Sequence, residues 1–245
     1  CLSQHQEVIR ALQDGAEKYG VGSGGSACIS GYTSAHQKAE ETFAEFLKRE
    51  KAILFPSGYH ANLGVITSFV NRNTKLMIDR LSHASIIDAA IMSRAKFKRY
   101  PHNNISAIDN FLGQVICTEG VFSMEGNITP LKSIVDFAQQ KEVLLILDDA
   151  HALGVISLRG SIDFHGLDNS DIPILINPLG KAVGIMGAFV SGSSDYMDYV
   201  VQRARSYKYT TSLSPILACA ITKSIEIMQH EHWRQEKLRS VIHMF

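Results

Sequence analysis

The sequence predicts an α/β fold with three layers, in which helices cover both faces of a mainly parallel sheet. Short, continuously apolar runs alternate with stretches of helical spacing, which is typical of strands buried on both faces. The composition, 45% hydrophobic and 20% charged over 245 residues, suffices for a sizeable core. Polar segments follow the apolar runs, at the strand ends where sheets of this class bind ligands.

Apolar spacing sets the order of the predicted elements. Helical spacing covers residues 4–19 and resumes at 34–49, after a glycine-rich loop at 20–32. The predicted strands are AILF (52–55), KLMI (75–78), QVICT (114–118), VLLIL (143–147) and IPILI (172–176). Further helices are predicted from about 58 and over 84–93, 131–141, 194–206 and 215–229, with another from Glu231 onward.

Charge and cysteine usage exclude several classes of function. Lys plus Arg and Asp plus Glu both number 24, so no basic excess indicates a nucleic-acid partner. No apolar run approaches the ~20 residues of a membrane helix, so we expect no membrane partner. The four cysteines are scattered, without a C-x-x-C pair, which favours reduced thiols and a cytoplasmic protein. They are Cys1, Cys28, Cys117 and Cys219.

Three of the strand ends carry polar residues with both a functional and a structural interpretation. Ser57-Gly58 would form an anion cradle at a helix N-terminus, or a plain N-cap serine with a turn glycine. His83 would be a ligand-facing residue or an exposed capping histidine. Ser123 lies in a segment that would bend over a site, or form an ordinary loop with turn glycines.

Two further strand ends carry an acid with a histidine, and an isolated lysine. Asp148 leaves a buried strand, where a carboxylate is costly unless it is paired, and His151 follows three residues later. The alternatives are a helix cap formed by Asp148 or Asp149, and a metal pair of Asp148 with His151 that lacks a third ligand nearby. Lys181 is the only lysine between Ile172 and Gly192, in a glycine-lined loop where a lysine can become a nucleophile. The alternative is a solvated loop lysine.

An anion cradle, a ring-facing histidine, an acid with a histidine, and an isolated lysine together make the set that pyridoxal 5′-phosphate (PLP) requires. In this order the chain resembles the α-oxoamine synthases, PLP enzymes of fold type I. The segments that carry the resemblance are GVGSGGSACISGY (20–32), FPSGYHAN (55–62), DRLSHAS (79–85), TEGVFSMEGN (118–127), DDAHALGV (148–155), LGKAVGIMGA (179–188) and YTTSLSP (209–215).

The resemblance implies a role for each residue around the cofactor ring. Lys181 would bind PLP covalently and act as the catalytic base. Asp148 would pair with the pyridinium nitrogen, and His151 would hydrogen-bond the ring oxygen with Ser123 close by. His83 would stack on the ring face and hydrogen-bond the developing oxyanion. No metal is implied.

The resemblance also implies how the phosphate is held. Ser57, Gly58 and Tyr59 would bind it through backbone and hydroxyl groups, and Thr211 would reach it from the neighbouring subunit of a homodimer. Family members usually have a threonine three residues before the lysine, whereas this chain has Pro178, which offers neither a hydroxyl nor an N–H. The phosphate contact that the threonine makes in the family is therefore not expected from Pro178.

The implied reaction is a decarboxylative condensation of an amino acid with an acyl thioester. The chain is most similar to members that join L-alanine to pimeloyl-CoA or a pimeloyl-acyl carrier protein, a step of biotin biosynthesis. Glycine with an acetyl thioester, serine with a long acyl chain, and a non-catalytic homologue stay open. An NAD-binding Rossmann domain is disfavoured because the GVGSGG loop follows a helical pattern and not a strand.

The resemblance also implies how the chain divides into domains. Residues 1–230 would form the PLP-binding large domain, whose N-terminal segment is missing. Residues 231–245 would begin the connection to a small C-terminal domain. Family members carry in that domain an arginine for the substrate carboxylate, and no residue of this chain can be assigned that role.

Overall fold

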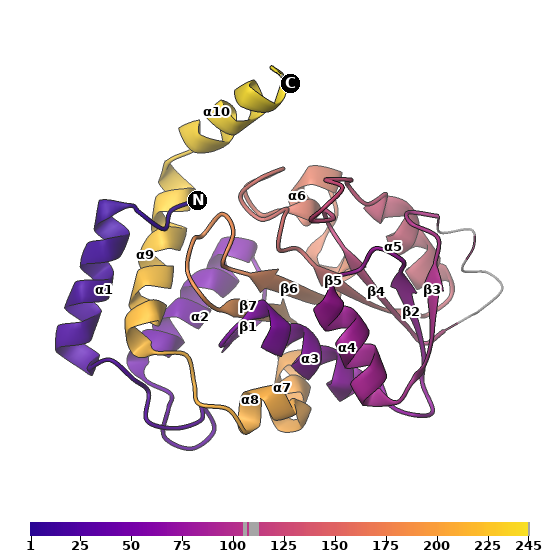
Figure 1. The fold of residues 1–245 in the computed structure, drawn as a ribbon, viewed down its shortest axis with the longest axis horizontal. Helices are drawn as coiled ribbons and strands as arrows, with labels where there is room; N and C mark the ends of the chain where they lie inside the picture. The colour runs from indigo at the N-terminus through magenta and orange to yellow at the C-terminus, as the bar shows by residue number, and fades with distance from the viewer. Residues whose placement is uncertain (105–106, 108–112, 245) are drawn as a thin grey trace.

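A computed structural model describes residues 1–104, 107 and 113–244 of the chain. Within this part, a central sheet lies between two layers of helices (Figure 1). Phe245, the last residue of the segment expected to lead into a small domain, lies outside the described residues.

The sheet has seven strands in the order β1-β7-β6-β5-β4-β2-β3. Strands β6, β5, β4, β2 and β3 pair in parallel, whereas β7 is antiparallel to both β1 and β6. The predicted α/β fold with a mainly parallel sheet is therefore confirmed. The strands are β1 (Lys51–Phe55), β2 (Lys75–Asp79), β3 (Lys96–Tyr100), β4 (Val115–Glu119), β5 (Leu144–Asp148), β6 (Ile174–Pro178) and β7 (Ala188–Gly192).

The helices divide into two layers, each with its own apolar core. The core on one face includes residues of α3 (Gly58–Phe69), α4 (Ala84–Ser93), α7 (Ser194–Arg203) and α8 (Arg205–Lys208). The core on the other face includes residues of α1 (Gln6–Tyr19), α2 (Ser34–Leu47), α5 (Leu131–Gln140), α6 (Ser161–His165) and α9 (Pro215–His230). A short 3-10 helix covers Asn169–Asp171.

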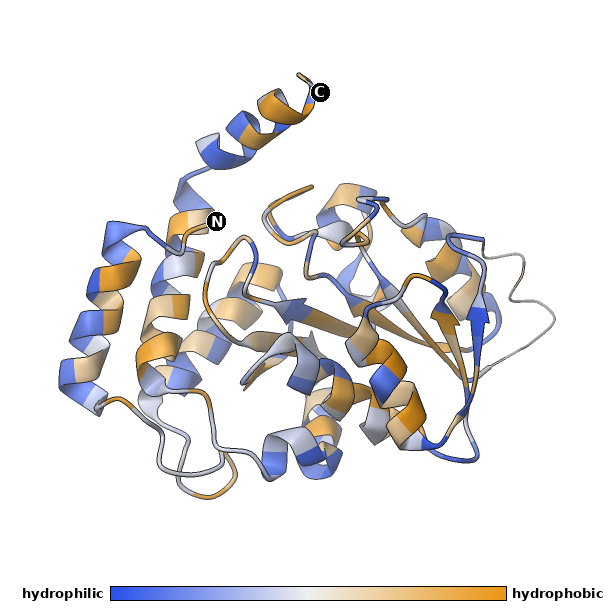
Figure 2. Cartoon of the chain, viewed as in Figure 1, coloured by the Kyte–Doolittle hydropathy of each residue, from blue (hydrophilic) through white to orange (hydrophobic). Residues whose placement is uncertain are grey.

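Alternation along the strands divides their side chains between these two cores. In β1, Ala52 and Leu54 belong to one core, whereas Ile53 and Phe55 belong to the other. Successive side chains of a strand point to opposite faces, so a strand covered on both sides must be apolar throughout. Figure 2 shows the resulting apolar strands at the centre of the molecule. This is why continuous apolar runs, without alternation, located the strands in the sequence.

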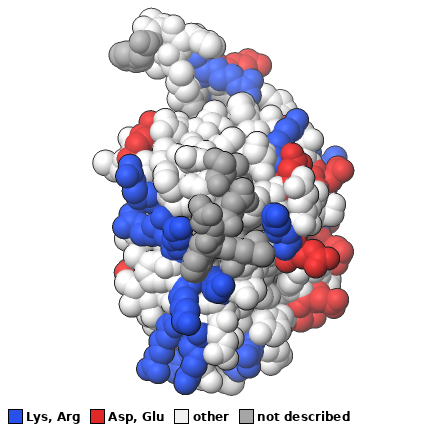
Figure 3. Space-filling view, turned by 90° about the vertical axis from the view of Figure 1, so that its right-hand side faces the viewer, with Lys and Arg blue, Asp and Glu red and all other residues white. Residues whose placement is uncertain are grey.

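Two strands have no counterpart among the predicted elements. Strand β3 lies at the edge of the sheet and carries Lys96, Lys98 and Arg99, so it contains no apolar run. Charged side chains on an edge strand oppose pairing with another sheet. Figure 3 shows the face on this side of the molecule, where lysine and arginine side chains gather along one flank. Strand β7 ends in Ser191-Gly192, so its apolar run covers only residues 188–190, which hid it in the sequence.

Helix α10 (Trp233–Ile242) extends away from the body of the molecule (Figure 1), and none of its residues is buried. Its residues fall in the segment expected to lead to a small domain, and that assignment stays a prediction. In the described ranges, no helix combines the length and the apolar character that crossing a membrane demands.

Candidate active site

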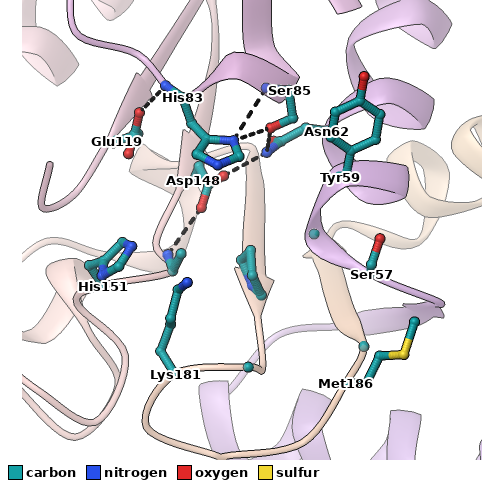
Figure 4. A pocket seen from close by; sticks show the side chains of 15 residues that line it. Ser57, Tyr59, Asn62, His83, Ser85, Glu119, Asp148, His151, Lys181 and Met186 are labelled. Carbon is teal, nitrogen blue, oxygen red and sulfur yellow. Dashed lines mark hydrogen bonds between the residues drawn. The ribbon is translucent and has the colours of Figure 1, made fainter. Parts of the chain in front are cut away.

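A cavity of about 260 Å³ opens at the carboxyl ends of the strands. Asp148, Glu119 and Pro178 are the last residues of β5, β4 and β6, and all three line it. The strand-end rule therefore located the cavity correctly. Its lining residues are Ser57, Gly58, Tyr59, Asn62, His83, Ser85, Glu119, Asp148, Ala150, His151, Pro178, Gly180, Lys181, Met186 and Gly187 (Figure 4).

Lys181 lies in the loop between β6 and β7 and directs its side chain into the cavity (Figure 4). Backbone hydrogen bonds hold this loop. The N–H of Leu179 donates to the oxygen of Gly187 at 2.9 Å, and the N–H of Leu2 donates to the oxygen of Ala182 at 3.1 Å. The backbone of Lys181 is thus held from both sides, while its amine faces open space that a ligand could fill.

Asp148 places a buried carboxylate opposite this lysine. Its Oδ2 accepts a hydrogen bond from Asn62 Nδ2 at 2.7 Å, and its Oδ1 accepts from the N–H of Ala150 at 3.0 Å. Burial raises the pKa of Asp148, whereas these hydrogen bonds and the histidines nearby lower it. No lysine or arginine among the described residues forms an ion pair with it. Such a carboxylate favours a ligand that brings a positively charged N–H group.

Two histidines complete the cavity wall around Asp148. His83 caps the N-terminus of α4, where its Nδ1 accepts from the N–H of Ser85 at 3.2 Å, so the predicted helix start is confirmed. The N–H of His83 donates to Glu119 Oε1 at 2.5 Å. His151 is half-buried, and burial followed by the positive charge of Lys181 lowers its pKa. A neutral imidazole there can exchange a proton with a ligand near physiological pH.

The start of α3 forms the opposite wall. Ser57 is its N-cap, and its Oγ accepts from the N–H of His60 at 3.3 Å, while Tyr59 donates its hydroxyl to Asp88 at 2.7 Å. Both side chains therefore have partners, and the backbone N–H groups of the first helical turn are the remaining donors for an anion. A Cβ on Gly58 would lie 2.6 Å from Pro178, so only glycine allows this close approach.

Two of the predicted cofactor residues lie elsewhere. Ser123 and Thr211 are exposed, and neither is among the residues that line the cavity. The predicted contact of Thr211 was one across a subunit interface, and a single chain does not test it. Both roles stay predictions.

The structure separates Asp148 from Asp149. Both oxygens of Asp149 are used, since Oδ2 accepts from the N–H of Ser161 at 2.9 Å and Oδ1 accepts from its hydroxyl at 2.5 Å. A Cβ on Gly120 or on Gly160 would collide with the Asp149 carboxylate, at 2.1 and 1.9 Å. Asp149 thus supports the start of α6, and Asp148 alone faces the cavity. Across the described residues, no three His, Cys, Asp or Glu side chains converge as a metal site requires.

Three lining residues with polar side chains were missed as candidates in the sequence, namely Asn62, Ser85 and Glu119. Glu119 ends a strand, so the same rule that singled out Asp148 could have found it. Asn62 is the fifth residue of α3 and Ser85 the second of α4, close behind the residues chosen there. Only the packing of the two helices on the sheet shows that these side chains meet.

Glu119 should make the folded protein less stable as the pH rises. Burial, followed by the charge of Asp148, raises the pKa of Glu119 from 4.5 to about 8. The folded state therefore holds this proton more tightly than the unfolded chain. Its stabilisation is complete below the unfolded pKa and is lost as the pH rises through the folded one.

Glu119→Gln keeps the acceptor for His83 but cannot ionise. Between about pH 5 and about pH 9, the wild type should lose on the order of a few kcal/mol more unfolding free energy than this variant. Urea unfolding at a series of pH values measures the difference. Glu142→Gln, at an exposed position between α5 and β5, is the control. Equal pH dependence in wild type and Glu119→Gln would contradict the expectation.

The chain matches a known protein family and two curated enzymes over its whole length. The family model for aminotransferase class I and II matches residues 1–245. A curated 8-amino-7-oxononanoate synthase from Pseudomonas putida (strain W619) is 44% identical over all of this chain and 64% of its own length. A second, from Pseudomonas syringae pv. syringae (strain B728a), is 42% identical over all of this chain and 63% of its own.

Solved structures agree. A serine palmitoyltransferase from S. paucimobilis with a bound PLP–myriocin aldimine has a TM-score of 0.93 and 31% identity, over 98% of this chain and 64% of that one. An 8-amino-7-oxononanoate synthase from Francisella tularensis has a TM-score of 0.87 and 33% identity, over 98% of this chain and 69% of that one. The predicted resemblance to α-oxoamine synthases is thus confirmed. The chain spans about 64% of the length of the curated relatives it matches.

Proposed function

We propose, from the premise that the chain belongs to the aminotransferase class I and II family, that its Lys181 cavity binds PLP for an 8-amino-7-oxononanoate synthase reaction. In that reaction L-alanine and a pimeloyl thioester give 8-amino-7-oxononanoate, carbon dioxide and the free thiol carrier. The observation that carries the proposal is the meeting of Lys181, Asp148, His83 and His151 at one cavity beside a helix N-terminus.

The chemistry of the cavity fits PLP at both ends of that molecule. Asp148 is a buried carboxylate without an ion-pair partner among the described residues, which suits the protonated ring nitrogen. The N-terminus of α3 suits the phosphate, since its first N–H groups have no partners within the helix. When bound, PLP supplies an electron sink for charge that develops at the amino-acid Cα.

The residues of the chain would divide the proton and charge transfers among them. The amine of Lys181 would hold the cofactor and then accept the Cα proton of alanine as general base. Asp148 would keep the ring nitrogen protonated, and His151 would donate to the ring oxygen. His83 would stack on the ring and donate to the thioester oxygen as negative charge develops there.

The remaining contacts of the proposal concern the phosphate and the assembly. Ser57, Gly58 and Tyr59 would surround the phosphate, mainly through backbone N–H groups, with Ser123 beside the ring and Thr211 contributed by a second subunit. A cytoplasmic homodimer with shared sites is the expected form. The exposure of Thr211 and of the apolar Ile29 and Tyr209 supports this assembly.

A direct assay tests the reaction and its substrate choice. We expect added PLP to produce a visible absorption band, and alanine with pimeloyl-CoA or a pimeloyl-acyl carrier protein to release the thiol. Glycine with acetyl-CoA and serine with palmitoyl-CoA are the competing pairs. Faster turnover with either pair would replace the proposed substrates. The same assay on the protein extended to the length of its relatives separates a missing segment from a wrong assignment.

Pro178 supplies a prediction about cofactor affinity. It lines the cavity against Gly58 and offers no hydrogen-bond donor. Pro178→Thr should tighten PLP binding by roughly three- to tenfold, since one added hydrogen bond to a charged group contributes about 1 kcal/mol or more. Valine has the shape of threonine without the hydroxyl, so Pro178→Val is the matched control. Titration of cofactor-free protein with PLP should therefore rank threonine above valine, and equal affinities would contradict a phosphate contact at this position.

A further inference from the structure

Four side chains on one wall of the cavity form a continuous chain of hydrogen bonds (Figure 4). Asn62 Nδ2 donates to Asp148 Oδ2 at 2.7 Å and to Ser85 Oγ at 2.9 Å. Ser85 Oγ in turn lies 2.7 Å from His83 Nδ1. Asn62 and Ser85 are buried, with 2% and 0% of their surface exposed. Two groups at the reacting centre, Asp148 and His83, are thus joined through two residues without any assigned role.

The carboxylate of Asp148, at one end of this chain of side chains, determines the direction of each hydrogen bond. An ionised carboxylate only accepts, so Asn62 must turn its amino group toward Asp148. The second N–H of that amino group then donates to Ser85 Oγ. A hydroxyl has a single proton, and that of Ser85 is left to donate to His83 Nδ1. The N–H of Ser85 also donates to Nδ1, at 3.2 Å, so Nδ1 accepts from two donors and carries no proton.

The unpartnered atom of Asn62 supports this orientation. Its Oδ1 is buried without a hydrogen-bond partner, while both N–H groups are used. An unsatisfied buried acceptor costs about 1–3 kcal/mol. The fold thus keeps both N–H donors of Asn62 engaged even though its acceptor is left unsatisfied, which indicates that Asn62 serves as a donor.

We propose that Asn62 and Ser85 are positioning residues that hold His83 as the tautomer protonated on Nε2. The ring then presents an N–H donor to the cavity, and not a lone pair. The tautomer follows from the chain of hydrogen bonds alone. Its use rests on the proposed function, in which negative charge develops on a thioester oxygen and requires a donor.

The arrangement also couples the histidine to the carboxylate. The charge of Asp148 orients Asn62, Asn62 orients Ser85, and Ser85 selects the tautomer. Glu119 contacts the same histidine, but only at its backbone N–H, so it positions the loop without affecting the ring proton. The nitrogen that carries the ring proton is therefore decided by the Asn62–Ser85 pair.

Asn62→Asp tests the proposal because it keeps the shape and replaces the amino group by an oxygen. Ser85 would then donate its proton to the new carboxyl, whether that group is ionised or shares a proton with Asp148. His83 could satisfy Ser85 Oγ only by carrying its own proton on Nδ1. Because the backbone N–H of Ser85 still donates to Nδ1, nitrogen-15 NMR of histidine-labelled, cofactor-free protein should show the population of the Nδ1-protonated tautomer of His83 rise at the expense of the Nε2-protonated one. A His83→Gln sample identifies the resonances among the ten histidines.

Ser82→Ala is the matched control, since Ser82 lies in the same loop and its buried hydroxyl has no hydrogen-bond partner. It should leave the tautomer unchanged, as should Glu119→Gln. Unchanged tautomer populations in folded Asn62→Asp overturn the proposal. If that variant does not fold, Ser85→Ala decides, because Nδ1 then loses one of its two donors and its resonance must shift toward that of a free lone pair. The spectra need no PLP, so a failure to bind the cofactor would not be mistaken for a failure of this inference.

Discussion

Lys181→Ala should abolish both the visible band formed with PLP and the turnover. The loop of Lys181 is held by backbone hydrogen bonds and directs the amine toward the Asp148 side of the cavity (Figure 4). In the proposed reaction the amine is both the covalent attachment and the general base, so its removal should eliminate the two together. Loss of general-base catalysis alone costs roughly 10²–10⁴-fold in rate. Absorption spectra and single-turnover assays of the purified variant measure the two effects.

Two control variants locate the cause of that loss. Lys181→Arg keeps the positive charge but offers no nucleophile or base, since an arginine stays protonated. It should be as inactive as Lys181→Ala. Lys132→Ala removes a lysine on an exposed position of α5 and should leave both measurements unchanged. Turnover within tenfold of wild type in Lys181→Ala would remove the lysine from the mechanism.

Asp148→Asn should preserve the fold and impair the chemistry. Burial raises the pKa of this carboxyl, so the folded protein gains nothing from the charge itself. An asparagine cannot stabilise a protonated ring nitrogen. Losing one partner of a buried charged pair costs about 3–5 kcal/mol, which corresponds to roughly 10²–10⁴-fold in rate. Steady-state kinetics, with thermal unfolding as the test of folding, check the two halves of the prediction.

The adjacent residue supplies the matched control. Asp149→Asn makes the same chemical change on a carboxylate that faces Ser161 and not the cavity. Its turnover should stay within a few-fold of wild type, while its unfolding temperature changes. Equal losses of turnover in the two variants would show that the charge of Asp148 has no special role.

The order of strands and helices was largely predictable because it depends on local pattern. Continuous apolar runs located β1, β2, β4, β5 and β6, and helical spacing located the long helices. Strand β3 escaped because an edge strand needs no apolar run, and α6 escaped because five residues carry too little periodicity. The cavity was predictable to the same extent, since strand ends meet at one edge of a parallel sheet.

The sequence by itself determined the α/β class, the place of the cavity at the strand ends, and Lys181, Asp148, His83 and His151 as its candidate groups. Only the tertiary structure showed what the neighbouring Asp149 does, because side chains alternate and its carboxylate faces Ser161 while that of Asp148 faces the cavity. The same holds for Asn62 and Ser85, whose hydrogen bonds join residues up to 86 positions apart. Hydrogen bonds across elements depend on how helices pack against a sheet, and no local pattern of residues encodes that contact.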